Sequence, residues 1–222
     1  PQTRIIYIAN PNNPTGTTFG AAEFSAFMQK IPGDVLVVYD EAYKEYAERS
    51  DLPNPFQFFK QYNNILTLHT FSKVYGLAGL RIGYGIGHPT LVAEMNKLRT
   101  PFNVTSVGQA AALAALDDNE HVERSAEMNR VERKRLYNEL RRLGLKPVPS
   151  ETNFLFMQIG PDAKSFCDEL LQEGVIVRPM AWMGFPEAIR ISVGNPAENT
   201  KLLGAVAHVL EVRSPFLAAK NT

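Results

Sequence analysis

Side chains that could perform chemistry gather in three short motifs of this 222-residue sequence. Asn13 stands in the turn NPNNPTG, and Asp40 and Tyr43 stand in DEAY. Lys73 ends the motif TFSK, and Arg81 follows it within a glycine-rich stretch. A lysine amine can form an imine with a carbonyl compound, a carboxylate can hold a protonated ring nitrogen, and an arginine can bind a phosphate dianion. Together with a phenol such as that of Tyr43, which can donate a hydrogen bond to a phenolic oxygen, these are the groups that pyridoxal phosphate (PLP) requires.

Each motif follows an apolar run that predicts a β-strand. The three runs span residues 4–9, 35–39 and 65–70. They are continuous rather than alternating, which is typical of parallel strands covered on both faces. Helical spacing at residues 20–30 and around 56–62 supplies intervening helices, and residues 80–86 predict a further strand. Ligands of open α/β sheets bind at the carboxyl ends of strands, so we expect the motifs to converge on one crevice.

The second half of the sequence changes to a helical pattern and then to a smaller mixed region. Residues 89–143 predict helices that end before Gly144. Further strands and helices are expected at 153–159, 163–172, 175–177, 189–193 and 197–212. We expect an α/β fold in two domains. Residues 1–119 form the C-terminal part of a large domain with a mainly parallel sheet and a connecting helix, and residues 120–222 form a small α+β domain.

In order and spacing, NPNNPTG, DEAY and SKVYGLAGLRIGYG resemble the motifs of the fold-type I PLP-dependent aminotransferases (class I/II), particularly the histidinol-phosphate aminotransferase group. The resemblance continues through TNFLFMQIG, GVIVRPM and AIRISVGNPAEN, so it covers essentially the whole chain. Any one motif alone is also typical of an ordinary turn or strand end, and only the ordered set is specific. The resemblance implies the PLP-dependent transferase fold, similar to aspartate aminotransferase, with PLP as the cofactor.

The resemblance also implies roles for individual residues. Lys73 is expected to hold PLP covalently and, once released, to move the substrate proton as a general base. Asp40 keeps the ring nitrogen protonated, and Asn13 and Tyr43 bind the phenolic oxygen of the cofactor. Asn13 is also expected to contact the substrate.

The remaining predicted contacts are with anionic groups. The resemblance implies that Arg81 binds the cofactor phosphate, with added hydroxyl contacts from Thr70 and Ser72. It implies that Arg190, which precedes Ile-Ser-Val-Gly, binds the substrate carboxylate or phosphate through a bidentate fork. Arg178 is expected beside it.

These roles imply transfer of an amino group between glutamate or 2-oxoglutarate and a second substrate. Histidinol phosphate is the leading second substrate, which would place the enzyme in histidine biosynthesis. Two alternatives stay open within the family: an aromatic amino-acid (phenylalanine or tyrosine) aminotransferase and a threonine-phosphate decarboxylase. A catalytically inactive PLP-binding module is the alternative from a different class, although every cofactor residue expected in this stretch is present.

The composition argues against several other partners. With 23 basic and 23 acidic side chains, the chain carries no net field that would attract nucleic acid or an anionic membrane. No apolar run is long enough to cross a bilayer, and the single Cys167 cannot form an internal disulfide. The histidines lack metal-ligand spacing, so we expect no metal site. We expect a cytoplasmic protein, and the resemblance implies a homodimer.

The resemblance also implies segments that would stand before residue 1. They are a glycine- and serine-rich phosphate loop, an aromatic residue that stacks on the pyridine ring, and a substrate-binding tyrosine. The strand predicted at residues 4–9 would be covered by such upstream elements. We therefore expect an N-terminal portion to be absent from this chain, and the 222 residues alone to bind PLP weakly and to be inactive.

Overall fold

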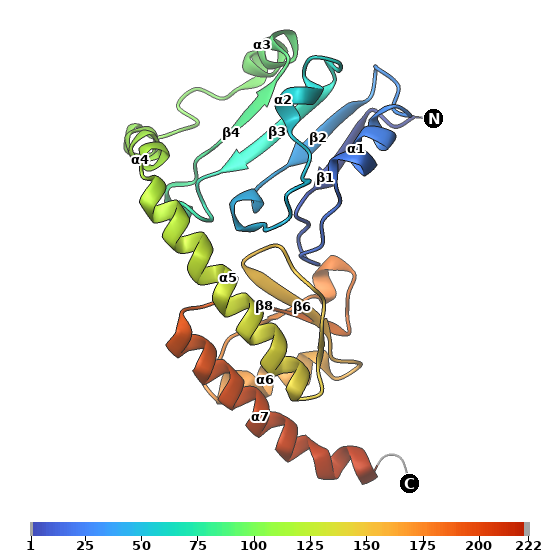
Figure 1. The fold of residues 1–222 in the computed structure, drawn as a ribbon, viewed down its shortest axis with the longest axis vertical. Coiled ribbons are helices and arrows are strands. Elements are labelled where there is room, and N and C mark those ends of the chain that lie inside the picture. The colour runs from blue at the N-terminus through green and yellow to red at the C-terminus, as the bar shows by residue number, and fades with distance from the viewer. Residues whose placement is uncertain (1, 220–222) are drawn as a thin grey trace. The chain divides into compact units, whose positions relative to one another are not determined.

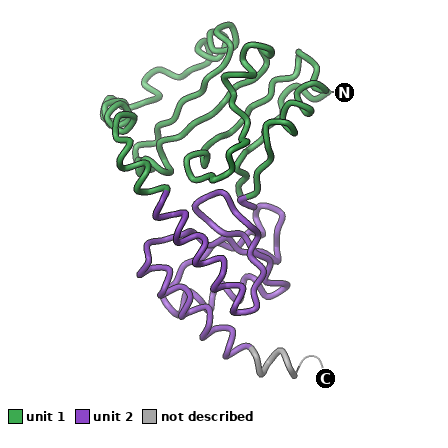
Figure 2. The backbone as a smooth tube through the Cα atoms, viewed as in Figure 1, with its two compact units in different colours: residues 1–13, 17–126 green, residues 14–16, 127–222 purple. Residues whose placement is uncertain are grey.

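The computed structural model describes residues 2–219, with side chains described as far as residue 213. The chain forms two compact units, residues 1–13 with 17–126 and residues 14–16 with 127–222 (Figure 2). Each unit has its own sheet and its own hydrophobic core. The domain boundary expected at residues 119/120 coincides with the start of helix α5 (Asn119–Arg142) and stays a prediction.

Four strands form the sheet of the first unit (Figure 1). They are β1 (Ile5–Ala9), β2 (Leu36–Asp40), β3 (Ile65–Thr70) and β4 (Gly83–Gly87), adjacent in that order. The first three are parallel, and β4 is antiparallel to β3. The strands β1 to β3 are rich in β-branched and other apolar residues, which pack well on a pleated sheet. The expected mainly parallel α/β sheet is thereby confirmed.

Helices α1 (Ala21–Met28) and α2 (Pro55–Phe58) supply the core that fixes β2 and β3. Their apolar side chains pack with those of the two strands in one cluster: Phe24, Met28, Val37, Tyr39, Phe58 and Ile65. The ring of Phe24 lies 4.8 Å from that of Tyr39 and 4.9 Å from that of Phe58, centroid to centroid. Fully burying each such side chain contributes about 1.5–3 kcal/mol. The cluster therefore holds the strand ends that carry the polar motifs.

Three helices follow β4, within the helical region predicted at residues 89–143. They are α3 (Pro89–Leu98), α4 (Ser106–Asp117) and α5. The break falls around Pro101, which lacks an N–H group and disfavours helix in the residue before it. The Thr105 side chain then accepts a hydrogen bond from the Gly108 N–H and begins α4.

The second unit contains an antiparallel sheet covered by helices. Its strands, in spatial order, are β5 (Lys146–Pro147), β6 (Phe154–Gln158), β8 (Ala188–Ser192) and β7 (Arg178–Pro179). Helices α6 (Ala163–Gln172) and α7 (Pro196–Ala219) join the end of α5 around a core that includes Leu136, Leu140, Leu155, Met157, Phe166, Leu170, Ile189, Ile191 and Val206. This is the small α+β unit that the sequence predicted.

The strand predicted at residues 175–177 is wrong, because these residues follow the end of α6. The Gly174 N–H donates to the Leu171 carbonyl (3.0 Å) and the Val175 N–H donates to the Leu170 carbonyl (2.9 Å). Gly174 has a φ of 70°, the left-handed conformation that commonly ends a helix. The N–H groups of Gly174 and Val175 thus bond to carbonyls of α6. Pairing with the neighbouring strand begins only at Arg178.

In the described part of the chain, none of the helices has the length and apolar character that crossing a membrane requires.

Candidate active site

A cavity of about 410 Å³ lies at the carboxyl ends of β1, β2 and β3 in the first unit. The strands end together because Ala9 pairs with Asp40 and Asp40 pairs with Leu68. All seven residues that the sequence predicted for the cofactor site line this cavity: Asn13, Asp40, Tyr43, Thr70, Ser72, Lys73 and Arg81. The structure thus brings these residues together, and their individual roles stay predictions.

Asp40 is the last residue of β2, and the main chain orients its carboxylate. Its Oδ1 accepts a hydrogen bond of 2.9 Å from the Ala42 N–H. Its carbonyl accepts a hydrogen bond of 3.0 Å from the Asn10 N–H, which keeps β1 and β2 aligned at their ends. The half-buried carboxylate is therefore held in place before any ligand binds.

Lys73 and Tyr43 are neighbours in this cavity. The Lys73 Nζ lies 5.0 Å from the centroid of the Tyr43 ring, within the range of a cation–π contact. Tyr43 is only 6% exposed, so its ring is a fixed surface beside the amine. The start of the loop that carries Lys73 is fixed by a hydrogen bond of 3.1 Å from the Ser72 N–H to the Thr70 Oγ1.

Arg81 has an unusual backbone conformation. Its φ of 51° and ψ of 47° are left-handed, a region where a residue other than glycine costs about 1–3 kcal/mol. Its guanidinium donates to the Ala78 carbonyl at 2.9 Å and to the Ser72 hydroxyl at 3.4 Å. Because Ala78–Leu80 form a 3-10 turn before this residue, β4 begins at Gly83, later than the sequence predicted. The strained turn brings a cation beside a hydroxyl group.

A group of ionisable side chains beside this cavity was missed by the sequence analysis. The Glu41 carboxylate is 2% exposed and lies 3.3 Å from the His69 Nε2 and 3.5 Å from the Lys44 Nζ. Burial, opposed by Lys44, raises the pKa of Glu41 to about 7, and burial lowers the pKa of His69. Both shifts favour the uncharged form of each side chain. A sequence signal existed, because both residues are polar neighbours of apolar runs, but their contact depends on strand pairing.

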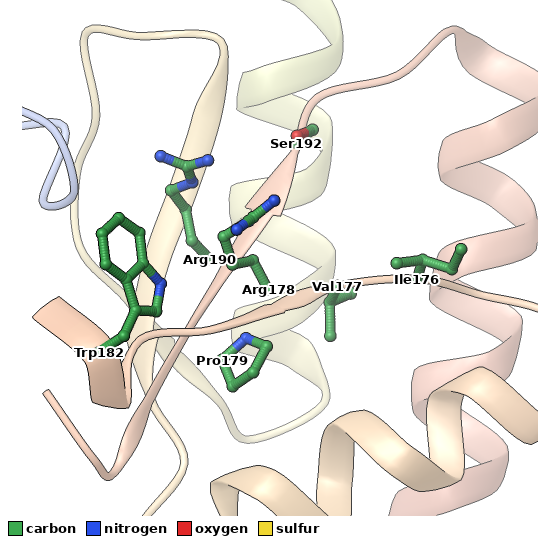
Figure 3. Close-up of a pocket in the computed structure, with 7 residues that line it drawn as sticks. All are labelled: Ile176, Val177, Arg178, Pro179, Trp182, Arg190 and Ser192. Carbon is green, nitrogen blue, oxygen red and sulfur yellow. The ribbon is translucent and has the colours of Figure 1, made fainter.

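The two remaining predicted residues line a cavity of about 360 Å³ in the second unit (Figure 3). Arg178 of β7 and Arg190 of β8 lie directly opposite each other on antiparallel strands. Figure 3 shows both arginine side chains and the exposed Trp182 among the residues that line this cavity. The Arg190 guanidinium also lies 4.6 Å from the centroid of the Phe154 ring. Like charges directly opposite in a sheet are destabilising, so this cavity is suited to an anion.

The described residues contain no cluster of three His, Cys, Asp or Glu side chains that could hold a metal ion. Cys167 packs in the core of the second unit, where burial raises the pKa of its thiol.

The family model for aminotransferase class I and II matches residues 1–206. The chain belongs to this family. Histidinol-phosphate aminotransferase 2 of Pseudomonas fluorescens is 51% identical to this aminotransferase-family chain over 209 residues, which are 94% of the chain and 56% of that protein. The chain thus spans little more than half the length of this curated relative.

Solved structures of aminotransferases are also similar to this chain. The crystal structure of histidinol-phosphate aminotransferase from Sinorhizobium meliloti in complex with pyridoxal-5'-phosphate matches 95% of this chain and 58% of that one, with a TM-score of 0.86 and 35% identity. A Thermus thermophilus aspartate aminotransferase tetra mutant matches 94% of this chain and 60% of that one, with a TM-score of 0.83 and 26% identity. The aminotransferase chain therefore has the aspartate aminotransferase-like fold that the sequence predicted.

Proposed function

We propose that this chain carries the covalent cofactor site of a PLP-dependent aminotransferase that acts on histidinol phosphate and 2-oxoglutarate in histidine biosynthesis. The observation that carries the proposal is one cavity lined by Lys73, Asp40, Tyr43 and Arg81. Similarity to histidinol-phosphate aminotransferases supports the choice of substrate. Because the chain covers 56% of the Pseudomonas relative, the activity is proposed for a protein of that relative's length.

The lining of the first cavity fits PLP. Its volume of about 410 Å³ is typical of a small-molecule site. The half-buried Lys73 amine lies beside a buried phenol, the Asp40 carboxylate is oriented by the main chain, and Arg81 lies within 3.4 Å of the Ser72 hydroxyl. When bound, PLP would supply an electron sink for negative charge at the α carbon of the substrate.

Lys73 has two proposed tasks. At rest its Nζ forms the covalent link to the cofactor. Once displaced by the substrate amine, the free amine would act as a general base that moves the α proton of the substrate to the cofactor's C4′, on the other side of the linking nitrogen. The buried Tyr43 ring, with its centroid 5.0 Å from Nζ, restricts the positions open to the amine during this transfer.

The other residues of the cavity are proposed to hold the cofactor. The negative charge of Asp40 favours a protonated ring nitrogen, and Asn13 and Tyr43 donate hydrogen bonds to the phenolic oxygen. Arg81 binds the phosphate with its positive charge. The hydroxyl groups that join it are those of Thr70 and Ser72.

Arg190 and Arg178 are proposed to bind the anionic part of the substrate. Their opposed positions on β7 and β8 support this role, because an anion between two guanidinium groups relieves their mutual repulsion. Glutamate and 2-oxoglutarate offer carboxylates, and histidinol phosphate offers a phosphate. Asn13 is proposed as a further substrate contact.

We also propose that the protein is a cytoplasmic homodimer. Large apolar side chains are exposed on α3, α4 and the segment between them: Leu98, Phe102, Val107, Leu113 and Leu116. Exposed apolar clusters commonly mark protein interfaces, which supports association of two copies. Sedimentation velocity tests the assembly, and a monomer at working concentrations would contradict it.

A panel of amino donors tests the proposed substrate, with 2-oxoglutarate as the common acceptor. Histidinol phosphate should exceed phenylalanine and tyrosine in kcat/KM by about 100-fold, because a site built for a charged group rejects a ligand that leaves it unpaired. Faster turnover of the aromatic acids would assign the aromatic activity instead. Release of CO₂ from threonine phosphate would assign a decarboxylase, and no turnover with bound PLP would indicate an inactive module.

A further inference from the structure

His121, near the start of α5, contacts the loop that carries Lys73. Its Nε2 lies 3.0 Å from the backbone carbonyl oxygen of Val74, the residue that follows Lys73. A carbonyl oxygen can only accept a hydrogen bond, so the Nε2 must carry the hydrogen. The neutral Nε2–H tautomer and the imidazolium both meet this requirement. Both residues lie in the first unit.

The loop is a closed turn with the reactive lysine inside it. The Leu77 N–H donates to the Phe71 carbonyl at 2.9 Å, which joins the two ends of the turn. The Gly76 N–H donates to the Lys73 carbonyl at 3.0 Å. The main chain on either side of the lysine is therefore restrained by local hydrogen bonds.

His121 adds a restraint from outside the turn. Val74 is 2% exposed, so its carbonyl lies in a packed region where an unmade hydrogen bond is costly. Gly76 has a φ of 71°, and a Cβ added there would lie 3.9 Å from the His121 Nε2. The imidazole thus packs against the turn itself.

The main chain of His121 is fixed at the start of α5. Its backbone N–H donates to the Asp118 Oδ1 at 3.0 Å, which satisfies one of the free donors of the helix start. The Ser125 hydroxyl, one helical turn later, lies 3.4 Å from the His121 Nε2. Because the His121 main chain belongs to α5, the hydrogen bond from its Nε2 to the Val74 carbonyl links the turn to this helix.

We propose that His121 is a positioning residue for Lys73, acting through its hydrogen bond to the Val74 carbonyl. The proposal deepens the proposed function, on which it rests, because it concerns the orientation of the amine that reacts there. His121 touches neither cofactor nor substrate in this role. Orientation matters at this point because a displacement of about 1 Å can cost about 10²-fold in rate.

Amide hydrogen exchange in the cofactor-free protein tests the restraint itself. His121→Leu removes the donor, His121→Gln retains an N–H donor, and His88→Leu at the N-cap of α3 is the matched control. His121→Leu should speed exchange at Gly76 and Leu77 by about 5-fold, as expected for the loss of one hydrogen bond. His121→Gln and His88→Leu should leave it near the parent rate. Unchanged exchange in His121→Leu would overturn the proposal.

The cofactor-loaded protein tests the consequence for Lys73. Per molecule of lysine-linked cofactor, His121→Leu should lower kcat by about 10- to 100-fold with little change in KM. It should also shift the pH midpoint of the near-visible absorption of the linked cofactor, and His121→Gln should restore most of both. If His121 had a merely structural role, His121→Leu would lower the thermal midpoint and the fraction of protein that carries cofactor. In that case kcat per linked cofactor and the pH midpoint would stay unchanged, and this result would overturn the proposal.

A cofactor found on a lysine other than Lys73 would overturn the proposed function, and this inference with it. The two failures are distinguishable, because only failure of the proposed function moves the cofactor label to another lysine.

Discussion

The two cavities of this chain are built in different ways. In the first unit, polar groups stand at the ends of parallel strands and the main chain orients them, as the Ala42 N–H does for the Asp40 carboxylate. In the second unit, Arg178 and Arg190 face the same cavity because two antiparallel strands pair them directly. The first arrangement fixes direction, which covalent and proton-transfer chemistry needs. The second gathers charge, which is enough to bind an anion.

Both cavities retain features that oppose folding. The left-handed conformation of Arg81 costs about 1–3 kcal/mol, and like charges directly opposite in a sheet are destabilising. We therefore expect substitutions in the first cavity to lower kcat or cofactor retention. Substitutions in the second cavity should raise the KM of the anionic substrate.

The largest effect is expected at Lys73. Lys73→Ala should lower kcat by about 10⁴-fold or more, because loss of a general base alone costs about 10²- to 10⁴-fold and the covalent link is lost as well. PLP should still bind, but it should be lost on dialysis. Single-turnover kinetics on protein of parent thermal stability measures the loss. The exposed Lys97, changed to alanine, is the control, and equal losses in the two variants would contradict the assignment.

Asp40→Asn should produce the next largest effect. The amide keeps the shape of the carboxylate and removes its charge, so kcat should fall by about 10²- to 10³-fold while PLP affinity falls less. Rate measurements at saturating PLP separate the two quantities. Turnover close to the parent rate with PLP bound would rule out the electronic role of Asp40.

The arginine pair of the second unit should respond differently. Arg190→Lys keeps the charge but not the bidentate fork, so the KM for histidinol phosphate or glutamate should rise by about 10- to 100-fold with a smaller change in kcat. Arg178→Lys, at the opposed position, should have the same direction of effect. A lower kcat with an unchanged KM in Arg190→Lys would contradict the assignment of substrate binding to the second cavity.

The smallest effect is expected at Glu41, and it concerns stability. Its pKa is raised to about 7 in the folded protein, so the stabilising contribution of its protonated form is fully present below pH 4.5 and is lost as the pH rises toward 7. Glu41→Gln, which cannot ionise, should therefore gain about 1–3 kcal/mol relative to the parent between pH 4.5 and 8.

Urea unfolding at the two pH values measures this difference. The exposed Glu94, changed to glutamine, is the control. A relative stability of Glu41→Gln that did not change with pH would show that the Glu41 carboxylate ionises normally.

The sequence predicted those parts of the fold whose signals are local. The run ILTLHT is β-branched and apolar, and β3 spans the residues expected for it. The strand predicted from Val175 failed because its N–H is used by the end of α6, which apolar character alone does not reveal. The apolar spacing predicts a helix around residues 56–62, but α2 spans only Pro55–Phe58. Helical spacing continues in the sequence beyond the point at which the helix ends.

The features of the candidate site also differ in whether the sequence alone can reveal them. The convergence of Asn13, Asp40 and Lys73 on one cavity could be predicted because their motifs follow strands in order along the chain. The contact between Glu41 and His69 could not, because it depends on β2 and β3 being neighbours, and the contact of His121 with Val74 joins positions 47 residues apart. Such contacts are fixed by tertiary packing, which no short motif encodes.

The most direct test of the central claim is to locate the cofactor on the chain. The purified protein is loaded with PLP, reduced with borohydride and digested, and the peptide that carries the pyridoxyl group is sequenced by mass spectrometry. We expect the label on Lys73, in the peptide that contains TFSK, and none on Lys73→Ala. Recovery of the label on any other lysine, or equal labelling of Lys73→Ala, would contradict it.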